Sequence, residues 1–434
     1  MSNASPPGVV PAGVQPELDA IYRKNAWRLL PFLLLCYTLA YLDRVNIGFA
    51  KLQMQVDVGI SDAVYGLGAG LFFIGYVIFE VPSNLLLVRV GARRTISRIM
   101  VLWGLTSAGM LFVQGEWSFY ALRFLLGVFE AGFAPGMIFY LTYWYTQKRM
   151  AGVMAVVMCA GPIGGAFGGP LSTWIMTRFD GTSGMQGWQW MFLLEGLPCV
   201  LLGVIAYFYL VDRPEDARWL NAREKKLLAD DLGRRRSGHE KHSFREVLRD
   251  RGVYALAATY FSLICGIYAV SFWLPTLLQS KGIEDTMLIG LYSAPPYLLA
   301  IVTMMWLARR SDRLDERRWH IAGPALLAGA SLCLATAFSQ HFALSMILIG
   351  LATALMWGAY IVFWAVPSRY LKGEAAAGGI ALINSIGLLG GFLSPSIIGW
   401  IKTATGSLSM ALYGLAALLA IGALPILFTR HARG

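Results

Sequence analysis

Long runs of apolar residues, separated by short polar breaks, follow one another along this 434-residue chain. A helix needs ~20 mostly apolar residues to cross the hydrocarbon core of a membrane, and the runs have about this length. The predicted fold class is therefore an all-α membrane protein. The pattern predicts twelve transmembrane helices, at residues 28–50, 63–88, 95–113, 117–146, 150–178, 189–211, 252–280, 286–308, 320–338, 341–366, 374–401 and 407–429.

One long polar segment, residues 212–251, divides these predicted helices into two groups of six. It separates an N-terminal six-helix bundle at residues 28–211 from a C-terminal six-helix bundle at residues 252–429. Within the polar segment, the spacing of apolar residues around Trp219 to Leu232 predicts one amphipathic helix. We expect the segment to be a linker between the two bundles.

The two groups of helices resemble each other in sequence. The run Gly161-Pro162-Ile163-Gly164-Gly165 recurs as Gly387-Leu388-Leu389-Gly390-Gly391, and a proline follows each run, at Pro170 and Pro395. The basic loop at residues 89–94 has a counterpart at residues 312–318. Two pseudo-symmetric bundles joined by a linker can rock against each other, which opens a site between them to either side in turn.

The composition agrees with a lipid environment, since 57% of the residues are hydrophobic and 14% are charged. The net charge of +11 does not indicate nucleic acid as a partner, because thirty of the 36 Lys and Arg residues fall in alternate loops. Lys51, Arg178, Lys281 and Lys402 fall on the other side. This asymmetry predicts a bacterial inner-membrane protein with both termini in the cytoplasm, where residues 1–27 and 430–434 form tails.

Cysteine and histidine usage predicts neither a metal site nor a disulfide framework. The five cysteines lie in apolar stretches without CxxC spacing, and none of the five histidines lies deep in a predicted helix. There is no nucleophile elbow, phosphate loop or metal-ligand spacing, and no sizeable soluble domain. We therefore expect no cofactor and no enzyme activity. A transporter-like receptor is a further alternative, against which the sequence offers only the lack of a signalling domain.

Six ionisable residues fall inside predicted helices, all in the first bundle: Asp43, Arg44, Glu80, Arg123, Glu130 and Glu195. An ionised side chain near the centre of a membrane costs at least ~2.5–3.5 kcal/mol, so each should face a partner or a hydrated cavity. Such a cluster is a hypothesis for the functional site.

Asp43, Arg123 and Glu130 are the candidates for proton coupling. The helical rise places Arg123 level with Asp43 and Glu130 deeper, and the seven-residue spacing puts Arg123 and Glu130 on one helix face. Protonation of one carboxylate would free the arginine to pair with the other or with substrate. The alternative is a static network of ion pairs that holds the helices together.

Arg44 is the candidate anchor for an anionic substrate. It is rotated by ~100° from Asp43 around the helix, and a guanidinium binds a carboxylate in a bidentate manner. The second bundle offers polar and aromatic groups, most of which we expect to serve packing. Its candidate substrate contacts are Tyr268, Trp364 and Asn384, and the amide of Asn384 suits a hydroxylated ligand.

Several motifs together resemble the anion:cation symporter family of the major facilitator superfamily. They are Tyr41-Leu42-Asp43-Arg44-Val45-Asn46-Ile47-Gly48-Phe49, Glu80-Val81-Pro82-Ser83-Asn84, the Arg123 to Glu130 segment, Trp188-Gln189-Trp190-Met191-Phe192 and the loop from Ser311 to His320. The resemblance implies the major facilitator fold and proton symport of organic anions such as sugar acids, tartrate, phthalate or hydroxyphenylacetate. It also implies that Asp43 and Glu130 bind protons, that Arg44 and Tyr76 contact substrate beside Tyr41, and that Arg123 pairs with Glu130.

The same resemblance implies gating roles for two cytoplasmic loops, at Arg89, Gly91, Arg93, Asp312 and Arg313. The superfamily loop after the second helix usually carries an acidic residue, but Val88 stands in that position here, while Asp312 is kept in the second copy. We therefore expect any latch formed by these loops to be asymmetric.

The sequence thus predicts a proton-coupled symporter that takes up a small organic anion, functions as a monomer in the lipid bilayer, and needs protons and the anion as its only other partners. The alternative is a proton-coupled exporter of drugs or cations from the same superfamily. The Gly161-Pro162 bend is a partial match to an antiporter motif, but two deep arginines would repel a cation.

Overall fold

The computed structural model describes residues 15–233, 248–371 and 374–428 of the chain. Within these ranges the chain forms helices joined by short connections, and twelve helical segments are long and apolar enough to cross a membrane. The predicted all-α membrane fold with twelve spans is confirmed. The tail at residues 430–434, the first part of the N-terminal tail and most of the basic part of the linker lie outside the described residues.

Six spans precede the linker, and four of them consist of two consecutive helices. The helices of this first half are α1 (Gln15–Val45), α2 (Ile47–Val58), α3 (Asp62–Val90), α4 (Ala92–Gly109), α5 (Glu116–Glu130), α6 (Phe133–Thr142), α7 (Gln147–Met158), α8 (Ala160–Phe179) and α9 (Gly187–Tyr209), with the short helices η1 (Met110–Phe112) and η2 (Thr182–Gly184). In the linker lie η3 (Pro214–Asp216) and α10 (Ala222–Gly233), which agrees with the predicted amphipathic helix.

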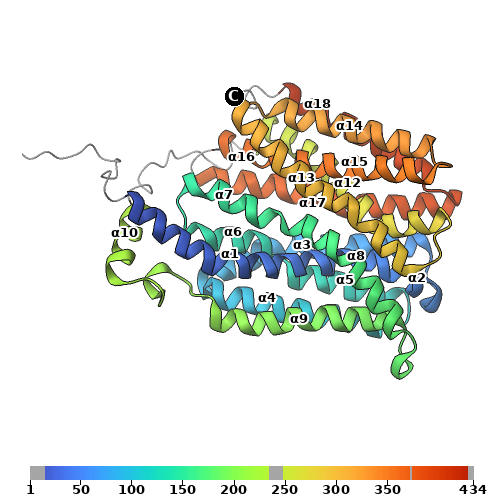
Figure 1. Ribbon diagram of the computed structural model, residues 1–434, viewed down its shortest axis with the longest axis horizontal. Coiled ribbons are helices and arrows are strands. Elements are labelled where there is room, and N and C mark those ends of the chain that lie inside the picture. Colours follow the sequence, from blue (N-terminus) through green and yellow to red (C-terminus); the bar gives the residue numbers. More distant parts are fainter. Residues whose placement is uncertain (1–14, 234–247, 372–373, 429–434) are drawn as a thin grey trace, which may run out of the picture.

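The second half contains the other six spans, of which one has a break near its end. Its helices are α12 (Arg251–Ser280), α13 (Thr286–Leu314), α14 (Arg318–Ala337), α15 (Phe342–Phe363), α16 (Ala365–Tyr370), α17 (Glu374–Thr405) and α18 (Ser409–Phe428). Figure 1 shows the helices of this half, in yellow to red, lying above those of the first half, in blue to green.

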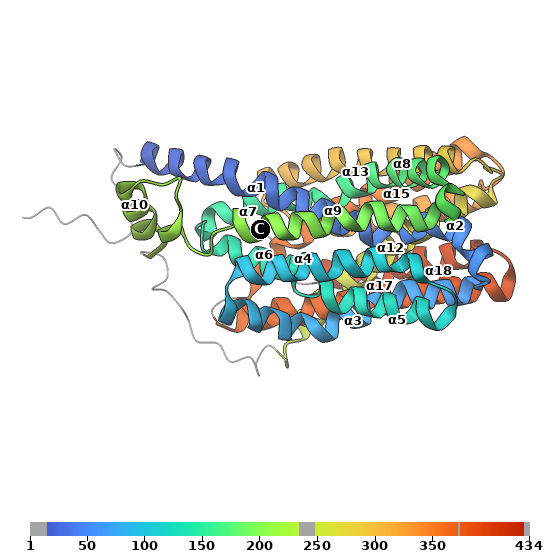
Figure 2. The same cartoon turned by 90° about the horizontal axis from the view of Figure 1, so that it is seen from below.

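The halves pack most extensively through two helix pairs, α3 with α17 and α8 with α13, and α2 also packs against α12. Figure 2 shows the first two pairs on opposite sides of the molecule, so that the two halves meet along two separate seams. Glycines allow the close approach along the first seam, since a Cβ atom added at Gly399 would lie 3.1 Å from Cα of Gly66. The side chains between the two seams belong to both halves.

The first helix begins at Gln15, well before the expected start at residue 28. Its N-terminal part packs against α10 in the linker: Tyr22 donates a hydrogen bond to Asp231 (2.8 Å), and Lys24 pairs with Glu224 (2.7 Å). The Lys24 ammonium lowers the pKa of the Glu224 carboxyl. An apolar run cannot reveal this part of the helix, because polar contacts with α10 stabilise it.

The fourth span is broken after Glu130, where one continuous helix was expected. Pro135 explains the break, because in a continuous helix its ring would collide with the carbonyl group of Ala131. Ala131 instead adopts an extended ψ of 130°, and Gly132 has a positive φ of 84°. The first span is different, because Asn46 between α1 and α2 keeps helical angles (φ −58°, ψ −27°) and the backbone hydrogen bonds continue through it. Glu130 therefore lies next to a helix break, and Arg44 does not.

The two halves are bonded together at the end of the molecule that carries Asp62, which we call the Asp62 end. The carboxylate of Asp62 pairs with Lys51 (2.7 Å) from its own half and with Lys402 (3.2 Å) from the second half. The Ala63 N–H donates to Thr403 Oγ1 (2.9 Å) across the same seam. Lys51 is buried and also donates to Thr276 Oγ1 (3.0 Å), so ionic and polar contacts close this end.

This closure predicts a specific cross-link. We expect Ala63→Cys combined with Thr403→Cys to form a disulfide under mild oxidation, because the two positions are joined by a hydrogen bond of 2.9 Å. The five native cysteines would first be replaced by alanine. The matched control pairs Ala63→Cys with Leu424→Cys, at the far end of α18. Non-reducing electrophoresis after proteolysis of the linker would detect the bond, and an equal yield in both pairs would contradict the closure.

Candidate functional site

An ion pair between Arg44 and Glu130 lies at the centre of the cluster of buried charges. Arg44 donates from Nη2 to Glu130, and the two side chains are 8% and 1% exposed. Arg44 Nη1 donates to the hydroxyl group of Tyr268 (2.7 Å), which belongs to the second half. One guanidinium thus connects a carboxylate of the first half with a phenol of the second.

The structure corrects the expected partner of Glu130, which is Arg44 and not Arg123. Arg123 is fully buried, and its Nη2 donates to the backbone carbonyl oxygen of Ala69 (3.2 Å). Its Nε and Nη1 have no hydrogen-bond partner among the described residues. The guanidinium carbons of Arg44 and Arg123 lie 5.0 Å and 5.3 Å from the centre of the Phe72 ring. The Phe72 ring therefore lies close to both cations, and the Nε and Nη1 groups of Arg123 are available to donate further hydrogen bonds.

Asp43 is buried and is bound by neutral donors of the first half. Trp103 donates from Nε1 (2.6 Å), Ser107 from Oγ (3.1 Å) and Cys199 from Sγ (3.2 Å). Among the residues the structure describes, no Lys or Arg forms an ion pair with it. Because all three donors belong to α4 and α9, Asp43 is bound within the first half and is not part of the ion pair.

Glu195 is held in a similar way, entirely within the first half. Asn46 donates from Nδ2 to one of its oxygens (2.9 Å), and Ser172 donates from Oγ to the other (2.7 Å). Cys199, which follows one turn later on α9, contacts both Asp43 and the backbone carbonyl oxygen of Glu195. Glu195 is therefore hydrogen-bonded by side chains of the first half, close to Asp43 through their shared neighbour Cys199.

Glu80 contacts the second half directly. Asn384 on α17 donates from Nδ2 to Glu80 Oε1 (3.0 Å), and the Tyr260 hydroxyl group donates to Asn384 Oδ1 (3.4 Å). Tyr76 lies one turn before Glu80 on α3, and its ring centre is 5.6 Å from the guanidinium carbon of Arg44. Three predicted site residues, Arg44, Tyr76 and Asn384, are thus brought into one region.

Aromatic side chains of both halves surround these polar groups. Tyr41 shares a hydrogen bond with Ser271 (3.2 Å) and contacts the ring of Trp357 at 5.6 Å. Trp364 packs edge-on against Tyr260 at 4.9 Å. Tyr41 therefore contacts the second half across the region between the halves, whereas the contact of Trp364 with Tyr260 lies within its own half.

The predicted gating loops make their contacts within their own halves. Gly91 has a positive φ of 97°, and the Arg93 N–H donates to Asp212 Oδ1 (2.9 Å) at the start of the linker. Asp312 pairs with Arg317 (2.5 Å), while Arg89 and Arg313 are exposed. In the loop after α3, where Val88 replaces the acidic residue, the carboxylate of Asp212 from the linker therefore binds the backbone at Arg93.

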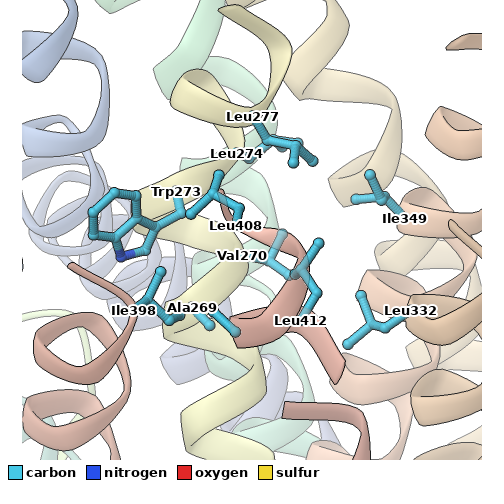
Figure 3. A pocket seen from close by; sticks show the side chains of 11 residues that line it. Ala269, Val270, Trp273, Leu274, Leu277, Leu332, Ile349, Ile398, Leu408 and Leu412 are labelled. Atoms are coloured by element: carbon cyan, nitrogen blue, oxygen red, sulfur yellow. The ribbon is translucent and has the colours of Figure 1, made fainter. Parts of the chain in front are cut away.

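A small pocket of about 30 Å³ lies among α12, α14, α15, α17 and α18, apart from the buried charges (Figure 3). Figure 3 shows aliphatic side chains and Trp273 around it, and its lining is apolar. A carboxylate entering it would lose its hydration without gaining a partner. The candidate site is therefore the charged region between the halves and not this pocket.

Some residues of the site were not predicted from the sequence: Trp103, Ser107, Cys199 and Tyr260. Trp103 and Ser107 are spaced by one helical turn, and so are Glu195 and Cys199. Polar groups at this spacing inside apolar helices were the available signal. For Tyr260 we find no such signal.

Comparisons with known proteins agree with a transporter. A family model described as Major Facilitator Superfamily matches residues 33–395. The chain is 46% identical to a putative metabolite transport protein NicT from Pseudomonas putida, over 92% of each chain. It is also 46% identical to a putative tartrate transporter from Agrobacterium vitis, over 93% of each chain. A quinolone resistance transporter from Acinetobacter baumannii is 38% identical, over 94% of each chain.

Among solved structures, that of a D-xylose-proton symporter has a TM-score of 0.74 and a sequence identity of 14%, covering 92% of this chain and 97% of that one. This likeness shows the fold: twelve membrane helices in the arrangement of these transporters. The fold expected from the sequence motifs is confirmed, and the names of the relatives are consistent with an anion:cation symporter type.

The environment of Asp43 predicts a loss of stability in Trp103→Phe. The variant removes the indole donor and leaves one carboxylate oxygen with a weaker set of partners, which costs ~1–2 kcal/mol. We expect the midpoint of thermal unfolding in detergent to fall by about 2–4 °C. Trp174→Phe is the control, because Trp174 is 49% exposed and packs against the ring of Phe179. Equal midpoints for the two variants would contradict the role of the indole donor.

Proposed function

Since the chain belongs to the major facilitator superfamily, we propose that it imports a small organic carboxylate together with protons. It is a multi-pass inner-membrane protein and a secondary transporter, and its relatives are named as transporters and not as enzymes. The proton coupling and the carboxylate class go beyond the family. Both rest on the buried charges between the two halves.

The ion pair of Arg44 with Glu130 is the observation that carries this proposal. Arg44 also donates to Tyr268, so any movement of the halves changes the surroundings of its charge. Removing one partner of a buried ion pair leaves an unpaired charge, at a cost of ~3–5 kcal/mol. When a proton neutralises Glu130, the guanidinium therefore needs another anion, and a substrate carboxylate can supply it.

Coupling follows from this exchange of partners. A proton on Glu130 favours binding of the anion to Arg44, and the bound anion favours retention of the proton by the same amount. Without either ligand, the ion pair with Glu130 satisfies Arg44. The state with both ligands and the state with neither are thus the two that leave neither Arg44 nor Glu130 as an unpaired charge, which links movement of the proton to movement of the anion.

Asp43 and Arg123 have supporting roles in this proposal. Arg123 has unfilled donors and lies against the same Phe72 ring as Arg44, so it adds positive potential for an arriving anion. Asp43 is a second proton acceptor, bound within the first half. Tyr41, Tyr76, Tyr268, Trp364 and Asn384 line the substrate region in this proposal.

The orientation of the chain is also part of the proposal. The excess of Lys and Arg in alternate loops places both termini and α10 in the cytoplasm, which makes the Asp62 end periplasmic. The loops with Arg89, Gly91, Arg93, Asp312 and Arg313 then adjust the cytoplasmic end of each half. A single chain contains both halves, so the transport unit is a monomer.

Export is the second candidate function, and the quinolone resistance transporter among the relatives favours it. Two buried arginines near the seam argue against a cationic cargo, because like charges repel strongly in a low dielectric. The direction of net transport distinguishes import from export.

Uptake into proteoliposomes tests the proposal. With an acidic exterior, we expect the wild type to accumulate labelled gluconate. Glu130→Gln and Asp43→Asn should lower accumulation by about tenfold or more, a change equivalent to ~1.4 kcal/mol. Exchange of internal for external substrate should persist in Glu130→Gln, because Arg44 still binds the anion.

Arg44→Ala is the contrasting variant, and it should lose both accumulation and exchange. Glu195→Gln removes a buried carboxylate that is bonded only within the first half, so it controls for loss of charge alone. Full accumulation in Glu130→Gln would remove that carboxylate from the proton path. Net efflux of cations in place of anion uptake would reject the proposal.

A further inference from the structure

Glu80 is a buried acid for which the proposed transport cycle has no use. It is 5% exposed, and it lies on α3 where that helix meets α17 of the second half. Its Oε1 atom accepts a hydrogen bond from Asn384, but Oε2 is buried and has no partner among the described residues. A buried carboxylate oxygen without a hydrogen-bond partner costs free energy in a membrane interior, so the presence of a glutamate at this position needs an explanation.

The position of Glu80 relates it to the substrate region. Residues four apart on a helix share a face, so Glu80 lies ~6 Å beyond Tyr76 along α3. Tyr76 faces the guanidinium of Arg44 at 5.6 Å. A ligand whose carboxylate replaces Glu130 at Arg44 and which extends past Tyr76 therefore reaches Glu80 and Asn384. The region has a cationic end at Arg44 and an acceptor end at Glu80.

We propose that Glu80 determines substrate specificity by accepting a hydrogen bond from a donor group on the end of the substrate opposite its carboxylate. This inference rests on the proposed function and specifies its substrate class as a monocarboxylate that carries hydroxyl or ammonium groups. A second carboxylate at that end would meet the carboxylate of Glu80 and be repelled. Asn384 holds Glu80 Oε1, which leaves Oε2 for the ligand.

A purely structural role for Glu80 makes a different prediction. If Glu80 served only to bind Asn384, a glutamine would replace it, since its amide oxygen accepts the same hydrogen bond. The second atom of the glutamine, however, is an NH₂ group that donates. Glu80→Gln therefore keeps the contact between the halves and reverses the polarity that the ligand meets.

Four six-carbon acids of similar length test the proposal by calorimetry on the purified full-length protein: gluconate, hexanoate, 6-aminohexanoate and adipate. We expect the wild type to bind gluconate about tenfold or more tightly than hexanoate, because a hydrogen bond to a charged group is lost with the hydroxyls. Tight binding of 6-aminohexanoate would show that an ammonium group can replace the hydroxyl groups of gluconate as the donor to Glu80. Adipate should bind most weakly.

Glu80→Gln should weaken the preference for gluconate over hexanoate, because a neutral hydrogen bond replaces one to a carboxylate, and should strengthen adipate binding, because the amide NH₂ can donate to the second carboxylate. Glu80→Ala should remove the preference for gluconate over hexanoate without strengthening the binding of adipate. This variant tests the proposal if Glu80→Gln does not fold. Glu195→Gln is the matched control and should leave the order of the four acids unchanged. An unchanged order in both Glu80 variants, with carboxylates still bound, would overturn the role of Glu80. A folded wild type that binds none of the acids would overturn the proposed function itself.

Discussion

The buried ion pair between Arg44 and Glu130 is the interaction on which the site depends, because an isolated charge is expensive in hydrocarbon. Both members of the pair belong to the first half, but Arg44 also reaches Tyr268 in the second half. A proton or an anion that changes one partner must therefore change the bonding across the seam. In this way a local electrostatic constraint connects two ligands to the packing of two six-helix halves.

One partner of that ion pair lies where the backbone is irregular. Glu130 is the last residue of α5 before the break that Pro135 enforces, whereas the backbone beside Arg44 stays helical through Asn46. Such a break is tolerated at membrane depth where protein surrounds it. At the Asp62 end, by contrast, glycine contacts and the ion pairs of Asp62 hold α3 and α17 together. Movement of the halves at that end therefore requires Lys402 to leave Asp62.

Hydrophobic periodicity was enough to predict the twelve spans and six of the buried ionisable residues, since lipid constrains both strongly, but it did not predict the burial of Lys51. It was not enough to predict the partner of Glu130. Spacing along one helix places Arg123 and Glu130 on one face, but the rotation of α1 relative to α5 decides that Arg44 reaches Glu130 first. The early start of α1 was missed for a similar reason, because its contacts with α10 are polar and distant in sequence. The break after Glu130 was available from Pro135, whose effect on the preceding turn is local.

The exchange of partners at Arg44 can be measured directly as proton uptake on substrate binding. The purified protein in weakly buffered solution would be mixed with a carboxylate that it binds, and the pH followed with an indicator dye. The account predicts that the solution becomes more alkaline, by about one proton per bound anion, because the anion displaces Glu130 from Arg44 and the freed carboxylate takes up a proton. The signal should vanish in Glu130→Gln and persist in Glu195→Gln. Stoichiometric binding without any proton uptake by the wild type would contradict the account.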